Sequence, residues 1–97
     1  MNVYISLPIT GKDPAQVKKV AKATKQKLKR MGHNPISPLD ICEDEYEYSK
    51  CIGVDIMAIL ESDAVLMCGD YEKSKGCRLE LCAAEIYGKQ ILIDKDL

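Results

Sequence analysis

Residues 74–85, SKGCRLELCAAE, place one carboxylate, Glu80, in a run that is otherwise typical of a buried helix. Ser74 and Gly76 open this predicted helix, where free N–H groups attract an anion or a hydroxyl-rich ligand. Glu80 follows Gly76 by four residues, so the two share one helix face and a ligand can lie above the carboxylate. The alternative is a surface Glu80 paired with a nearby Lys or Arg, and the spacing alone does not choose between them.

A second carboxylate, Asp55, lies inside a predicted helix at about residues 47–61, flanked by Val54 and Ile56. This helix leads directly into a strand, so its residues can approach the same edge of a sheet as Glu80. Two carboxylates around one polar pocket would support glycosidic chemistry, in which one attacks the anomeric carbon and the other handles the proton of the leaving group. The alternative is an Asp55 that pairs with a lysine or faces water.

The apolar pattern predicts four short strands, at residues 2–6, 33–37, 64–68 and 90–93. Helices alternate with them, from Asp13 to Gly32, from about 47 to 61, and from about 74 to Gly88. The order βαβαβαβ predicts one α/β domain over residues 1–97, a Rossmann/flavodoxin-like three-layer sandwich with a short parallel sheet of about four strands. The Pro-interrupted strand 33–37 suits a sheet edge.

Ligands of such sheets bind beyond the carboxyl ends of the strands, where the strand order reverses. This rule gathers three predicted loops at one edge: residues 7–11, residues 68–75, and the acidic loop after Ser37 with Asp40, Glu43, Asp44 and Glu45.

The composition indicates a soluble globular protein: 97 residues, net charge -1, 46% hydrophobic and 30% charged. That charge gives no reason to expect nucleic acid or membrane binding, no apolar run approaches a membrane span, and the N-terminus lacks a signal-peptide pattern, so we expect a cytoplasmic protein. The first helix carries seven Lys and Arg residues. We interpret them as a solvated face; a nucleotide or acidic partner is the alternative.

The cysteines and the histidine argue against a metal site. The five cysteines form no C-x-x-C pair, and four of them lie among apolar residues, where they are interpreted as core fillers. His33 is the only histidine, which disfavours zinc and a Ser-His-Asp triad. We therefore expect neither a metal nor a cofactor.

Three segments, VYISLPITG, DIMAILESDAV and SKGCRLE, resemble nucleoside 2-deoxyribosyltransferase-like proteins in order and spacing. The likeness covers nearly the whole chain. It is greatest to a small branch of unknown function with the pattern Y-I-S-G-P-I-T-G, C-D-A, S-x-G-A-x-x-E. The resemblance implies that Glu80 is the nucleophile that attacks C1′ of the sugar, that Asp55 takes part in proton transfer, and that the hydroxyl of Tyr4 orients the nucleophile.

The resemblance also implies a substrate site. Ser74 and Gly76 would hold the 5′ end of the sugar, and the first loop would contribute Ser6, Leu7, Pro8 and Gly11. Leu7 replaces the family's glycine, and its side chain would crowd a phosphate held close to the backbone. The chain is shorter than the transferases, in which a neighbouring subunit completes the pocket, so we expect a homo-oligomer.

The resulting hypothesis is a nucleoside or nucleotide N-glycosidase or 2-deoxyribosyltransferase that acts on a small molecule rather than on a nucleic acid polymer or a membrane. The alternative is a non-catalytic domain of the same fold that senses or sequesters a nucleotide, which Leu7 and the short chain favour. A third possibility is an assembly protein with a vestigial pocket.

Overall fold

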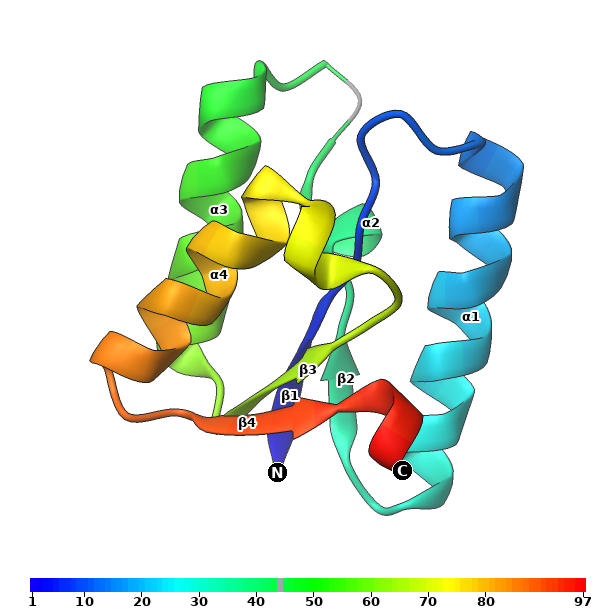
Figure 1. Ribbon diagram of the computed structural model, residues 1–97, viewed down its shortest axis with the longest axis vertical. Coiled ribbons are helices and arrows are strands. Elements are labelled where there is room, and N and C mark those ends of the chain that lie inside the picture. The colour runs from blue at the N-terminus through cyan, green and yellow to red at the C-terminus, as the bar shows by residue number, and fades with distance from the viewer. Residues whose placement is uncertain (44) are drawn as a thin grey trace.

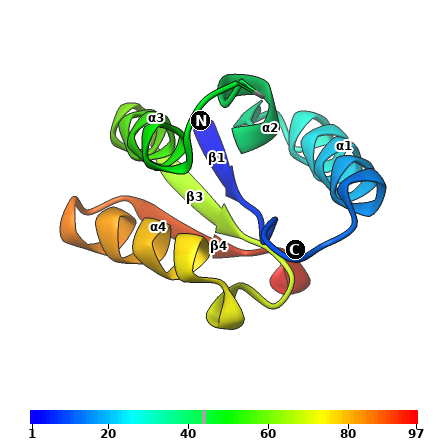
Figure 2. The ribbon, with the colours of Figure 1, turned by 90° about the horizontal axis from the view of Figure 1, so that it is seen from above.

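The computed structural model describes residues 1–43 and 45–97 (Figure 1). Asp44, part of the predicted acidic loop, lies outside the described residues. Helix α1 covers one face of a central sheet, and helices α3 and α4 cover the other, which gives the predicted three-layer α/β sandwich (Figure 2). The strands are β1 (Asn2–Ser6), β2 (Asn34–Ile36), β3 (Ala64–Met67) and β4 (Gln90–Ile93). The long helices are α1 (Pro14–Arg30), α3 (Tyr48–Glu61) and α4 (Lys75–Ile86).

All strand pairs are parallel, in the order β2-β1-β3-β4. From β1 the chain crosses to β2 at one edge of the sheet, and from β3 it crosses to β4 at the other edge. The strand order therefore reverses between β1 and β3, and the loops that follow these two strands diverge to opposite faces of the sheet. A ligand site is expected at this point in open α/β sheets. The weak strand 33–37 is found at the edge, as predicted.

The alternation of side chains along β1 divides the core into two parts. Val3 and Ile5 point to the α1 side, where they pack in one buried cluster with Leu28. Tyr4 points to the opposite side and packs in a second cluster with Ile59 and other side chains of α3 and α4. Both clusters are buried, so β1 is packed on both of its faces.

The helix ends follow the local signals. Asp13 caps α1 by accepting a hydrogen bond from the backbone N–H of Ala15 at 3.2 Å, and Gly32 has the positive φ of 85° that ends the helix. Ser74 caps α4 in the same way, with its hydroxyl accepting from the N–H of Cys77 at 3.2 Å. Among the described residues, no helix combines the length and the apolar character needed to cross a membrane.

The predicted loop after Ser37 contains a short helix, α2 (Pro38–Ile41), that the sequence reading missed. Ser37 caps it by accepting from the N–H of Leu39 at 3.2 Å. Two short 3-10 turns, Tyr71–Lys73 and Asp94–Asp96, also lie outside the predicted elements.

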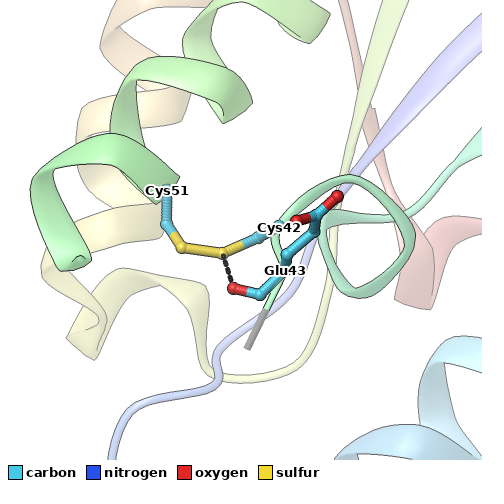
Figure 3. Close-up of a disulfide and its surroundings, with 3 residues drawn as sticks. All are labelled: Cys42, Glu43 and Cys51. Atoms are coloured by element: carbon cyan, nitrogen blue, oxygen red, sulfur yellow. Dashed lines mark hydrogen bonds between the residues drawn. A yellow bond between two sulfur atoms is a disulfide. The ribbon is translucent and has the colours of Figure 1, made fainter. Parts of the chain in front are cut away.

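Two of the cysteines correct the interpretation as core fillers. Cys42, directly after α2, forms a disulfide with Cys51 in the first turn of α3, with 5.3 Å between their Cα atoms (Figure 3). The turn made by α2 brings Cys42 back to α3, a tertiary effect that residue type does not reveal. Cys68 and Cys77 are buried thiols as expected, whereas Cys82 is exposed.

Candidate active site

A cavity of about 700 Å³ opens at the carboxyl ends of β1 and β3, where the strand order reverses. Residues 7–12, after β1, form one wall, and residues 73–77 at the start of α4 form another together with Asp70. Helix α3 contributes Tyr48, Ile52 and Asp55, and Glu80 lies in the wall made by α4. The first two predicted loops therefore meet at this edge, and the third contributes Pro38.

Glu80 is held in one orientation by two hydroxyl groups of β1. The Tyr4 hydroxyl donates to Oε2 of Glu80 at 2.6 Å, and the Ser6 hydroxyl donates to Oε1 at 2.7 Å. Tyr4 and Ser6 are two residues apart on one strand, so both point to the same face of the sheet. The side chain of Glu80 is only 5% exposed. Its carboxylate thus has a bonded partner on each oxygen and still faces the cavity.

Asp55 is the second carboxyl group of this cavity, and it lacks the partners that Glu80 has. It is 9% exposed, and its Oδ1 has no hydrogen-bond partner within residues 1–43 and 45–97. Burial raises its pKa to about 6, and the nearby hydroxyl of Tyr4, whose proton is donated to Glu80, lowers it in part. A buried carboxyl oxygen without a partner is costly when charged, so this position favours the protonated form.

The electrostatics of the two carboxyl groups are coupled. Burial raises the pKa of Glu80 to about 7; the hydrogen bonds from Tyr4 and Ser6 lower it, and the neighbouring Asp55 raises it further. Burial and the two carboxylates also raise the pKa of the Tyr4 phenol, which keeps its proton. Near pH 6 to 7 the carboxyl pair therefore carries one proton between its two members, as in other carboxyl pairs that share a site.

The rim of the cavity is polar, and an ion pair joins its two loops at the point where the strand order reverses. Nζ of Lys12, after β1, lies 2.9 Å from Oδ2 of Asp70, after β3, so an ion pair joins the two loops. Gly76 lines the cavity, and a Cβ placed there would meet nothing nearer than Oγ of Ser74 at 4.0 Å. Leu7 is 7% exposed and packs mainly into the core on the α1 side, so it lines the cavity without filling it.

The structure brings together Glu80, Asp55 and Tyr4, as expected from the sequence. Of the expected substrate-binding residues, five line the cavity: Leu7, Pro8, Gly11, Ser74 and Gly76. Ser6 has a different place, fully buried behind Glu80.

Sequence reasoning missed Lys12, Asp70, Tyr48 and Ile52 as cavity residues. Lys12 directly follows the predicted loop 7–11, and Asp70 lies in the predicted loop 68–75. Their opposite charges, on two loops expected at the same edge of the sheet, were the signal that could have predicted the ion pair.

Comparison with known proteins agrees with this architecture. A family model described as a domain of unknown function, DUF4406, matches residues 1–93. A 2-deoxyribosyltransferase structure from Bacillus psychrosaccharolyticus is similar at a TM-score of 0.76 and 23% identity, covering 96% of this chain and 71% of that one. Among curated protein sequences no match is found.

Two further structures are similar. The CMP N-glycosidase BcmB of Clostridium botulinum has a TM-score of 0.70 and 20% identity, with 96% of this chain and 70% of that chain covered. A 2-deoxyribosyltransferase from Leishmania mexicana has a TM-score of 0.75 and 21% identity, with 95% and 62% covered. At these identities the likeness establishes the fold. The chain belongs to the DUF4406 family, and its fold is that of the 2-deoxyribosyltransferases.

Proposed function

We propose that this protein cleaves the N-glycosidic bond of a nucleoside or nucleotide, with Glu80 as the nucleophile. The observation that carries the proposal is a pair of buried carboxyl groups facing one cavity. One is oriented by two hydroxyl donors, and the other has an oxygen, Oδ1 of Asp55, without a hydrogen-bond partner among the described residues. The two named activities among the similar folds, 2-deoxyribosyl transfer and CMP N-glycoside cleavage, act on bonds of this class.

In the first step, a carboxylate oxygen of Glu80 forms a bond to C1′ while the bond from C1′ to the base nitrogen breaks. The base leaves with the electron pair of that bond and takes a proton from Asp55. The reacting form needs the single charge of the pair on Glu80 and the proton on Asp55. The pKa values, about 7 for Glu80 and about 6 for Asp55, leave the proton on Glu80 in the resting protein, and their small difference makes the reacting form accessible. Two hydroxyl groups donate to Glu80 and stabilise its charged form.

In the second step, water or a second base attacks C1′ and releases Glu80 as a carboxylate. Asp55, now ionised, accepts the proton of the attacking group and is restored. Hydrolysis and transfer differ only in which acceptor enters the cavity.

The cavity fits a substrate that carries a phosphate or a free hydroxyl at its 5′ end. Ser74 and Gly76 lie at the N-terminus of the twelve-residue helix α4, where backbone N–H groups and the helix dipole favour an anion. Lys73 and Lys75 also line the cavity and supply positive charge, whereas the charge of Lys12 is paired with Asp70. We therefore include 5′-monophosphates among the candidate substrates.

The test is release of free base from a panel of deoxynucleosides, ribonucleosides and their 5′-monophosphates, followed by chromatography. Wild type should release base from at least one of them, and Glu80→Ala should release none while keeping the circular dichroism spectrum of the fold. A panel without any base release contradicts the proposal. A nucleotide-induced thermal shift that persists in Glu80→Gln, without turnover, would instead identify a sensor or sequestering domain.

We also propose a homo-oligomer. Large apolar side chains are exposed on both helices of one face, Met57 and Leu60 on α3 and Leu79 and Ile86 on α4, and these would be covered by a second copy. Sizing chromatography with light scattering tests this, and a monomer at micromolar concentration contradicts it.

A further inference from the structure

We propose that Ser6 is a positioning residue that fixes the carboxylate of Glu80 from behind and makes no contact with the substrate. This inference rests on the proposed function, in which Glu80 attacks C1′. It gives Ser6 a role different from that of its neighbours Leu7 and Pro8, which line the cavity.

The geometry separates Ser6 from the ligand. Its side chain is fully buried at the carboxyl end of β1 and is not among the described residues that line the cavity, whereas Glu80, to which it is bonded, lines it. Its hydroxyl donates its one proton to Oε1 of Glu80 at 2.7 Å, so that proton is not available to a sugar or a phosphate.

The two donors on Glu80 do different work because they bind different oxygens. Tyr4 bonds Oε2 and Ser6 bonds Oε1, so together they fix the plane of the carboxylate, which a single donor would leave free to rotate. Each oxygen retains a lone pair that is not used by these bonds. Both donors stand on β1, which is packed on both faces, so the nucleophile is oriented by a rigid strand.

Loss of the Ser6 hydroxyl should change the reaction in a particular way. A hydrogen bond to a charged group is among the stronger ones in proteins, so Ser6→Ala should lower kcat about 10- to 100-fold while KM stays within about twofold. The remaining titratable groups that face Glu80 are Tyr4 on β1, Asp55 on α3 and Cys77 on α4, and all stay in place. Ser6→Ala removes one hydrogen bond that stabilises the charged form of Glu80. The pKa of Glu80 should therefore rise, and the acid limb of the pH profile of kcat should move to higher pH.

The experiment compares Ser6→Ala, Ser6→Thr and Ser62→Ala with wild type. Ser6→Thr keeps the hydroxyl and should recover most of the loss in kcat. Ser62→Ala is the matched control, because Ser62 is also a buried serine but bonds to the carbonyl of Ala58 at the opposite end of β3. It should leave kcat and its pH profile unchanged. Cooperative thermal unfolding of each variant establishes that the fold is intact.

A second readout needs no turnover. In protein labelled with 13C-glutamate, the carboxyl signal of Glu80, assigned by its loss in Glu80→Gln, is titrated in wild type and in Ser6→Ala. A midpoint that moves to higher pH supports the positioning role. An unchanged midpoint overturns it.

The two readouts also separate this inference from the proposed function. If wild type releases no base from any substrate, the proposed function fails, and the carboxyl titration still decides whether Ser6 controls Glu80. If base is released and Ser6→Ala raises KM with kcat unchanged, Ser6 contacts the substrate and the positioning role is wrong.

Discussion

Substitution of Glu80 by glutamine should make the protein more stable at neutral and alkaline pH. In the folded protein, burial raises the pKa of this carboxyl group from its ordinary 4.5 to about 7. Between these two values the folded chain holds a proton that the unfolded chain has released. The stabilisation is therefore complete below about pH 4.5 and is lost as the pH rises through about 7.

The magnitude follows from the two pKa values. A change of one in pKa corresponds to about 1.4 kcal/mol, so the full contribution of Glu80 is about 3 kcal/mol. Over the range from pH 5 to pH 8 it amounts to about 2–3 kcal/mol. A small domain has only about 5–15 kcal/mol of stability in total, so the effect is readily measured.

Urea unfolding of wild type and Glu80→Gln at pH 5, 6, 7 and 8, followed by circular dichroism, gives the free energy of unfolding for each. The difference between the two proteins removes the contribution of titrating groups that do not interact with Glu80, whereas Asp55 is coupled to Glu80 and responds to the substitution. Wild type should lose about 2–3 kcal/mol more than Glu80→Gln over this range. Parallel pH dependence of the two proteins would refute the view that Glu80 is a buried carboxyl group held at a cost in stability.

Three further predictions concern other parts of the site. Tyr4→Phe removes the donor to Oε2 of Glu80 and should lower kcat about 10- to 100-fold with the fold intact; steady-state kinetics check this, and an unchanged kcat contradicts it. Reduction of the bond between Cys42 and Cys51, or Cys51→Ser, opens a loop with a sequence separation of 9 and should lower the free energy of unfolding by about 3 kcal/mol. Urea unfolding with and without reductant measures this loss, and coincident curves would show that the bond does not stabilise the fold. Gly76→Ala adds a methyl group toward the cavity with no contact nearer than 4.0 Å, so KM should rise while thermal stability stays equal or increases; a drop in stability would show that the site is more closely packed than described.

The elements of the fold could be predicted because their signals are local. Strand β3 is a continuous apolar run, and α1 has a capping aspartate, a proline at its first position and a terminal glycine, none of which needs tertiary information. The short helix α2 was missed because four residues carry too little periodicity to stand out from a loop. The disulfide was missed for a related reason, since α2 is what brings Cys42 to Cys51.

The site was predictable only in part. Tyr4 and Glu80 are 76 residues apart, and their contact was expected only from the likeness to a family. The topology of parallel sheets predicted the edge of the sheet at which the site lies. The role of Ser6 had a signal that was not used, because residues 4 and 6 of one strand must point to the same face. The ion pair of Lys12 with Asp70 depends on the conformations of the loops after β1 and β3, which the sequence pattern does not determine.

Capture of a covalent sugar on the protein is the measurement that tests the central claim most directly. The protein is mixed with a 2′-fluorinated nucleoside, whose electron-withdrawing substituent slows hydrolysis of a glycosyl ester, and is then digested and analysed by mass spectrometry. We predict an added sugar on the peptide that contains Glu80, absent in Glu80→Gln. Base release without any adduct on Glu80, or release that persists in Glu80→Gln, would contradict a carboxylate nucleophile at this position.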